Sequence, residues 1–244
     1  MDLMALTAEI ISKSSSTIAL TGAGISAESG IPPFRGSGGL WEKYDPEEYA
    51  TIDAFHMDPG KVWIMLKELG DLVLRSEPND GHRALAELEE MGKLKSIITQ
   101  NIDGLHQKAG SRSVIEFHGN HRTIVCTSCR MRTDYEYVSL ETLPPVCACG
   151  GILKPTSVLF GEPIPSHALH IAFDDASTCE ALLVIGTSAV VAPASQIPLI
   201  AKQNGAKIIE INTERTILTE TISDILLEGS SSQILPLIVK RLKQ

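Results

Sequence analysis

Short, largely apolar runs that alternate with helical segments constrain the fold of this chain more than any other feature. Five of these runs lie at residues 17–21, 94–99, 181–185, 207–211 and 224–227. Runs that are buried on both faces and separated by helices are typical of a parallel sheet covered on both sides. We therefore predict an α/β fold with a Rossmann-type open parallel sheet and helices on both faces.

Hydrophobic periodicity between the runs predicts the helices. They are expected at residues 59–75, 81–91, 102–109, 166–177, 193–204 and 231–243, after an amphipathic helix that begins near Leu3. Two segments do not follow the alternation and are interpreted as insertions that form a smaller domain. We predict a sheet domain from residues 1–32, 80–120 and 155–244, and a small domain from residues 33–79 and 121–154.

Four of the five cysteines are clustered, as Cys126-x-x-Cys129 and Cys147-x-Cys149. Two close pairs of this kind suit a tetrahedral zinc site, with each pair on its own short turn. Four thiolates leave no open coordination position, so the zinc is expected to be structural. Cys179 stands alone and is expected to be a small core residue.

A glycine-rich turn follows the first predicted strand and reads Gly22-Ala23-Gly24-Ile25-Ser26-Ala27. It fits G-x-G-x-x-G/A, a motif in which glycines let the backbone approach a pyrophosphate. A lone match is equally consistent with an ordinary tight turn. The next segment, GIPPFRGSGGLW, does not form a second strand with an acidic ribose ligand, so the pattern argues against a hydride-transferring dehydrogenase.

Polar residues follow other strands, where an open α/β sheet binds its ligands. Gln100, Asn101 and Asp103 follow one strand, and His118 follows the short strand expected at residues 114–117. Amides and carboxylates at these positions can hydrogen-bond a carboxamide and ribose hydroxyls, and His118 is a candidate general base. Helix capping is the alternative for Asn101 and Asp103, and it applies equally to Gly186-Thr187-Ser188 and Asn212-Thr213-Glu214 after two further strands.

Charge and hydropathy narrow the classes of partner. The net charge is −9, opposite to the balance expected of a duplex-binding protein, so we expect no direct nucleic-acid binding. No apolar run reaches the roughly 18 residues of a membrane helix, and the N-terminus lacks the basic region of a secretory signal. We therefore expect a cytoplasmic protein without membrane association.

Taken together, the motifs resemble those of the sirtuin family, and most closely its compact bacterial and archaeal members. The motifs are GAGIS, AESGIPPFRG, TQNIDGLH, His118-Gly119, the two cysteine pairs, KPTSVLFGE, GTS and INTE, and they span roughly residues 5–242. The resemblance implies a large Rossmann-type domain and a small domain made of a helical insertion and a zinc ribbon. It also implies NAD as co-substrate and acyl-lysine proteins as substrates.

The resemblance assigns roles residue by residue. It places around NAD the residues Gly22, Ala23, Gly24, Ser26, Phe34, Arg35, Gln100, Asn101, Ile102, Asp103, Gly186, Thr187, Ser188, Asn212, Thr213, Glu214 and Ser230. Phe34 and Arg35 have an alternative interpretation, as a packed aromatic and a surface cation in a loop. Ser230 stands where family members often have an alanine against the adenine. The resemblance assigns catalysis to His118 and Asn101, and the edge that pairs with substrate peptide to Val158, Leu159, Phe160, Gly161 and Glu162.

The implied reaction is NAD-dependent deacylation of protein lysine. The acyl oxygen attacks C1′ of the nicotinamide ribose, nicotinamide leaves, and His118 then deprotonates a ribose hydroxyl that attacks the acyl carbon. The products are free lysine, nicotinamide and O-acyl-ADP-ribose. A mono-ADP-ribosyltransferase and a non-catalytic NAD-sensing or zinc-ribbon binding protein remain as alternatives.

Two leucines bear on the acyl group that is accepted. Relatives that prefer succinyl or malonyl lysine resemble one another in a Tyr and an Arg on the helix at residues 59–75, and by alignment this chain has Leu66 and Leu69 there. An apolar floor disfavours a buried carboxylate, so acetyl and longer apolar chains are expected to be preferred. In the alternative interpretation, these leucines are only helix core.

Overall fold

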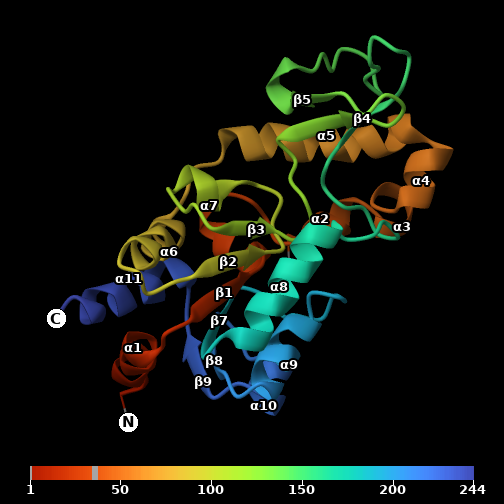
Figure 1. Ribbon diagram of the computed structural model, residues 1–244. Coiled ribbons are helices and arrows are strands. Elements are labelled where there is room, and N and C mark those ends of the chain that lie inside the picture. The colour runs from red at the N-terminus through yellow and green to blue at the C-terminus, as the bar shows by residue number, and fades with distance from the viewer. Residues whose placement is uncertain (1, 35–37) are drawn as a thin grey trace.

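A six-stranded sheet forms the centre of the computed structural model, which describes residues 2–34 and 38–244 (Figure 1). Its strand order is β3-β2-β1-β7-β8-β9, and neighbouring strands are parallel throughout. The strands are β1 (Thr17–Thr21), β2 (Ser96–Thr99), β3 (Val114–Glu116), β7 (Ala181–Ile185), β8 (Lys207–Asn212) and β9 (Ile225–Glu228). The predicted Rossmann-type fold is confirmed.

The apolar runs are explained by burial of the central strands. Every residue of β1 and of β7 is buried, because helices cover the sheet on both faces. The strand order reverses beside β1, since the chain adds β2 and β3 on one side of it and β7, β8 and β9 on the other. In open α/β sheets, ligands bind outside the carboxyl ends of the strands at such a point.

Helices pack on the two faces of the sheet in two groups (Figure 1). One core contains side chains of α1 (Leu3–Lys13), α6 (Asp80–Glu90) and α11 (Ser231–Leu242). The other contains side chains of α8 (Ser166–Thr178), α9 (Gln196–Gln203) and the short α10 (Ile217–Thr221). Except for α10, which the periodicity did not predict, these helices lie within a few residues of their predicted segments.

A second module lies beyond the sheet at the top of Figure 1. Its three-stranded antiparallel sheet has the order β5-β4-β6, from β4 (Thr123–Cys126), β5 (Arg132–Asp134) and β6 (Leu153–Pro155). Its helices are α2 (Leu40–Lys43), α3 (Pro46–Tyr49), α4 (Ile52–Met57) and α5 (Pro59–Arg75). The two inserted segments share one core, in which the buried Trp63 of α5 donates its indole N–H to the Leu153 carbonyl at 2.8 Å.

One predicted helix is wrong in its extent. The segment predicted as a helix from 102 to 109 is helical only at α7 (Leu105–Lys108). Gly104 has a φ of +72°, and the Ile102 carbonyl accepts a hydrogen bond from the His121 backbone N–H, so the first residues cannot join the helix. Similarly, the turn after β1 continues as a 3₁₀ helix, Ala23–Ser29.

No helix among the described residues is both long and apolar enough to span a bilayer.

Candidate functional site

Three glycines let two strand-end turns pack directly against each other. Gly22 and Gly24 follow β1, and Gly186 follows β7. The Gly24 N–H donates to the Gly186 carbonyl at 2.9 Å, and a Cβ on Gly24 would lie only 2.7 Å from the Gly186 Cα. A Cβ on Gly22 would lie 2.6 Å from that of Thr187. The glycines are therefore required for close backbone contact, which accounts for the G-x-G pattern before any ligand is considered.

Asn101 and Ser26 form a buried polar network beside this turn. The Asn101 amide nitrogen donates to the Gly22 carbonyl at 3.0 Å and to Ser26 Oγ at 3.1 Å. Ser26 Oγ in turn donates to Asp103 Oδ2 at 2.7 Å. The other Asp103 oxygen accepts the Leu105 N–H at 2.9 Å, so Asp103 holds the start of α7 whereas Asn101 caps no helix. Burial raises the pKa of the Asp103 carboxyl, and its hydrogen bonds partly oppose that shift.

The sequence analysis missed His82, which completes this network from α6. Its Nδ1 accepts the Asn79 backbone N–H, so Nε2 carries the proton and faces Ser26 Oγ at 3.4 Å. Burial lowers the pKa of His82 to about 4, which keeps the ring neutral. A histidine on the apolar face of a predicted helix was the available signal. His106 packs edge-to-face against the His82 ring, with centroids 4.9 Å apart, and its Nε2 lies 2.9 Å from Thr21 Oγ1.

The hydrogen bonding of His118 defines which ring nitrogen can act as a base. Its Nδ1 lies 3.1 Å from the Gln100 backbone carbonyl. A carbonyl only accepts, so Nδ1 carries the proton and Nε2 keeps its lone pair. Burial lowers the pKa of His118 below its ordinary value, against a smaller opposing effect of this hydrogen bond. A neutral imidazole with a free Nε2 is the form that a general base requires.

The amide residues at the other strand ends connect these turns. The Gln100 side chain donates to Thr187 Oγ1 at 2.9 Å, and that oxygen also accepts the Ala189 N–H. The Asn212 amide lies 3.3 Å from the Thr187 carbonyl. Ser188, Thr213 and Glu214 are exposed next to them. The strand ends β2, β7 and β8 thus meet in one group.

Ser230, Phe34 and Arg35 are three further residues that were predicted to contact NAD. Ser230 is the N-cap residue of α11, and its Oγ lies 3.2 Å from that of Ser232. Phe34 packs on Trp41 with ring centroids 5.3 Å apart, which fits the interpretation of a packed loop aromatic. Arg35 lies outside the described residues.

The expected peptide edge, residues 158–162, is already partly paired within the chain. Phe160 donates its N–H to the Ala50 carbonyl at 2.8 Å and accepts the Ile52 N–H at 2.9 Å. The Val158 N–H donates to the His118 carbonyl at 2.9 Å. Within the described part of the chain, the Gly161 N–H and the carbonyls of Val158, Gly161 and Glu162 form no hydrogen bond, so these backbone groups are available to a bound strand.

Leu66 and Leu69 lie in the core of the small module. They are 2% and 7% exposed and pack with Trp63, Ile124 and Leu153. The Leu66 carbonyl also accepts a hydrogen bond from His121 Nε2 at 2.8 Å. An acyl chain would therefore meet little of either leucine unless neighbouring side chains move.

The four clustered cysteines converge on one point. Their Sγ atoms all lie within 4.8 Å of one another, with Cys126 and Cys147 buried and Cys129 and Cys149 exposed. A Cβ on Gly151 would lie 2.7 Å from the Cys126 Sγ, so the glycine after the second pair makes room for the thiols. Four sulfur donors at this separation fit tetrahedral zinc. Cys179 is buried beside α8 and belongs to the core there.

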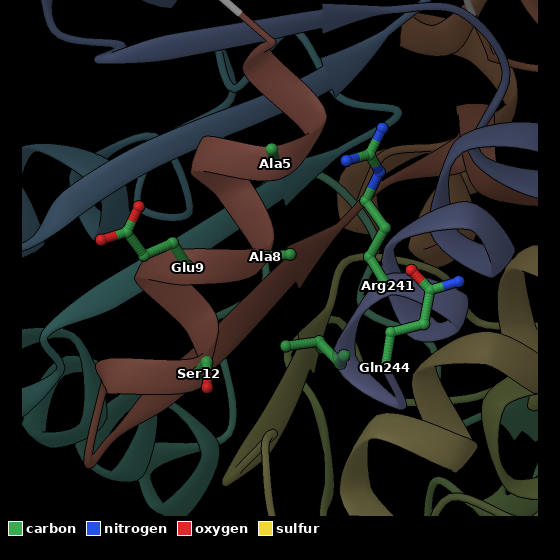
Figure 2. Close-up of a pocket in the computed structure, with 7 residues that line it drawn as sticks. Ala5, Ala8, Glu9, Ser12, Arg241 and Gln244 are labelled. Carbon is green, nitrogen blue, oxygen red and sulfur yellow. The ribbon is translucent and has the colours of Figure 1, made fainter.

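One hollow on the surface is remote from these residues. A cavity of about 350 Å³ lies between α1 and α11, lined by Ala5, Ala8, Glu9, Ser12, Arg241, Leu242 and Gln244 (Figure 2). Its Arg241 is paired with Asp2 at 2.8 Å and its Glu9 with Lys13 at 2.6 Å. With its charges paired and none of the strand-end residues in its wall, this cavity is not part of the candidate site.

Comparison with known proteins shows matches over nearly the whole chain. The Sir2 family model matches residues 22–193. The chain is 46% identical over 243 residues to an NAD-dependent protein deacylase of Thermococcus kodakarensis, covering 97% of this chain and 94% of that protein. It is 47% identical over 238 residues to NAD-dependent protein deacylase 2 of Pyrobaculum aerophilum, covering 97% and 95%.

Solved structures match equally well. A mutant Sir2 homologue in complex with ADP-ribose has a TM-score of 0.94 at 44% identity, covering 98% of this chain and 96% of that one. A Sir2 mutant with a deacetylated p53 peptide and 3′-O-acetyl-ADP-ribose has a TM-score of 0.93 at 35% identity, covering 97% of both chains. A Sir2 protein bound to a myristoylated histone peptide has a TM-score of 0.83 at 39% identity, covering 99% and 97%.

Proposed function

The chain belongs to the Sir2 family, and from that premise we propose how its own residues carry out the reaction. The protein is an NAD-dependent protein deacylase, with NAD as co-substrate and one structural zinc ion in the small module. NAD supplies the ribose that accepts the acyl group as nicotinamide leaves. The observation that carries the assignment of the base is the His118 imidazole, neutral and with its free nitrogen at Nε2.

We propose that His118 Nε2 removes the proton of a ribose hydroxyl. The Gln100 carbonyl holds the ring through Nδ1–H, so the base nitrogen is fixed in direction before substrate arrives. The positive charge that develops on the ring is stabilised by the same carbonyl. His118 therefore acts after NAD is bound and contributes little to NAD affinity.

Around NAD, we propose that the Asn101–Ser26–Asp103 network binds the nicotinamide end. The buried Asn101 and Asp103 sit beside the Gly22 turn, where a ligand can exchange hydrogen bonds with a preformed network. The Gly22 and Gly24 turn, Thr187 and Asn212 serve the phosphates and the adenosine. The glycine packing supports this role, because a turn without Cβ atoms lets a phosphate approach the backbone closely.

We further propose that acyl-lysine proteins bind along residues 158–161 and that the protein acts in the cytoplasm. Residues 33–79 and 121–154 would form the small domain against which the substrate is held. The core shared by α5 and β4–β6 supports this division.

For the acyl group, we propose a preference for acetyl and longer apolar chains over succinyl. Leu66 and Leu69 offer no cation to a succinyl carboxylate, and an unpaired buried carboxylate is costly. Comparing kcat/KM on one peptide with acetyl, myristoyl or succinyl lysine tests this, and a preference for succinyl would contradict it. Equal rates for acetyl and myristoyl lysine would indicate that the two leucines serve only as core.

The experiment that tests the function is incubation with NAD and an acetyl-lysine peptide, followed by mass spectrometry. Deacylase activity yields free lysine, nicotinamide and O-acetyl-ADP-ribose in equal amounts. Transfer of ADP-ribose to protein would indicate a transferase instead, and NAD binding without turnover would indicate a sensing or binding protein.

A further inference from the structure

Lys154, in β6, is a charged side chain that is almost completely buried. The residue is 7% exposed, and its ammonium group contacts three oxygen acceptors. Nζ donates to the Ser157 carbonyl at 2.8 Å and to the Pro155 carbonyl at 3.1 Å, and it pairs with Glu162 Oε2 at 2.8 Å. An ammonium has three N–H donors, so its hydrogen-bonding capacity is fully used inside the protein.

Glu162, the anion that pairs with Lys154, also holds the turn in which it lies. Its Oε2 also accepts the Leu159 N–H at 2.8 Å, and its own N–H donates to the Leu159 carbonyl at 3.0 Å. The turn from 159 to 162 is thus held by its own carboxylate, and Lys154 anchors that carboxylate to the small sheet. Glu162 is positioned by these bonds to support the edge rather than to contact a peptide itself.

The segment that Lys154 holds is joined by a backbone hydrogen bond to His118, the proposed base. The Val158 N–H donates to the His118 carbonyl at 2.9 Å. At Gly119, a Cβ would lie only 2.2 Å from the Thr156 carbonyl oxygen, so these two segments of the chain are in backbone contact. A shift of the 157–162 segment would therefore change the distance between a bound acyl-lysine and His118.

The cost of burying an ammonium argues against a purely structural role. A buried ion pair contributes little net stability compared with apolar side chains of similar size, and a neighbouring strand residue of β6, Leu153, is apolar. An apolar side chain at position 154 could not hold the Ser157 carbonyl and the Glu162 carboxylate at the same point.

We propose that Lys154 is a positioning residue for the acyl-lysine peptide, which sets the backbone of residues 158–161 relative to His118 through Glu162 and the Ser157 carbonyl. This inference rests on the proposed use of that segment as the peptide edge. It assigns to Lys154 an effect on peptide affinity that is separate from NAD affinity.

The test is the substitution Lys154→Met, which keeps much of the length of the side chain and removes the ammonium. We expect the KM and the Kd for an acetyl-lysine peptide to rise about tenfold or more, with the KM for NAD changed less than about twofold. Zinc content should remain one per chain. Lys202→Met is the matched control, because it removes a surface ammonium paired with Asp224 at 2.8 Å, far from the peptide edge, and should change neither constant.

Glu162→Gln provides a second variant in case Lys154→Met does not fold. The amide oxygen can still accept the Leu159 N–H, so the turn survives while the ion pair is lost. We expect a smaller rise in peptide KM in the same direction. Where both single variants fold, the double variant should be no worse than Lys154→Met alone, because the two side chains act through one contact.

Peptide affinity measured by fluorescence anisotropy separates this inference from the proposed function. A wild-type protein that binds the peptide but does not deacylate it contradicts the function and leaves the Lys154 effect measurable. The inference is overturned by variants that bind peptide with wild-type affinity. It is also overturned by an equal loss of NAD and peptide affinity with a lowered melting temperature, which would indicate general destabilisation.

Discussion

At the scale of single residues, backbone carbonyls and neighbouring amides determine which nitrogen or oxygen is available for chemistry. The Gln100 carbonyl leaves Nε2 of His118 free, and the Asn79 N–H leaves the proton of His82 on Nε2, toward Ser26. Ser26 Oγ then accepts from Asn101 and donates to Asp103. Each of these side chains is thus fixed in one hydrogen-bonding state before NAD binds, which is what a preorganised site requires.

The substitution His118→Ala tests the base directly. We expect turnover to fall by roughly two orders of magnitude or more, the usual contribution of a general base. NAD affinity should change little, because His118 acts on NAD that is already bound. Steady-state deacylation and NAD titration measure the two effects, and near-normal turnover would show that another group is the base.

The pH dependence of turnover tests the same residue without a mutation. The base works as the neutral imidazole, so activity is lost as the pH falls through the pKa of His118. Burial lowers that pKa in the free enzyme, so the acid limb of kcat/KM should have its midpoint below 6.5. A midpoint at or above 6.5 would contradict the burial effect.

At the scale of elements, the three-stranded sheet depends on its metal. The strands β4, β5 and β6 are three or four residues long, and such short strands need further stabilisation. Cys126 is the last residue of β4, and the other three cysteines lie in the segments that join the strands, so a bound zinc ion would stabilise the sheet. The sheet in turn carries Lys154 and the segment from 157 to 162.

We expect Cys126→Ala to lose most of the bound zinc and to destabilise this sheet, lowering deacylation indirectly. Elemental analysis should give one zinc per chain for the wild type and much less for the variant. Cys179→Ala is the matched control, since it also removes a buried thiol but one that lies in the sheet-domain core. A folded, fully active variant without metal would contradict the assignment.

At the scale of the whole molecule, buried neutral histidines make the fold sensitive to acid. Burial lowers the pKa of His82 and of His121 to about 4, and that of His106 well below its ordinary value. In the unfolded chain these histidines take up protons near pH 6.5, whereas in the folded chain His82 and His121 stay neutral until about pH 4. The contribution of these groups to stability is therefore fully present above pH 6.5 and is lost as the pH falls toward 4.

We expect the free energy of unfolding to fall steadily between pH 6.5 and 4, by up to about 3 kcal/mol for each of His82 and His121. Urea unfolding at several pH values measures the slope. His121→Gln should flatten it, because glutamine does not titrate and its amide can still donate to the Leu66 carbonyl. His167→Gln, at an exposed histidine, should not change it, and equal slopes in all three proteins would contradict the prediction.

The sequence by itself determined the sheet, the metal site and the group of strand-end residues. Each of these depends on local pattern: apolar runs for β1 and β7, spacing for the cysteines, and polar residues directly after strands. What followed from family resemblance alone, such as the roles of Leu66 and Leu69, stays a prediction. The tertiary structure decided the rest, because those contacts join residues distant in the chain. His82 reaches Ser26 from another helix, and Gly24 meets Gly186 across two strands. No local pattern encodes such contacts, since they arise when separate elements pack.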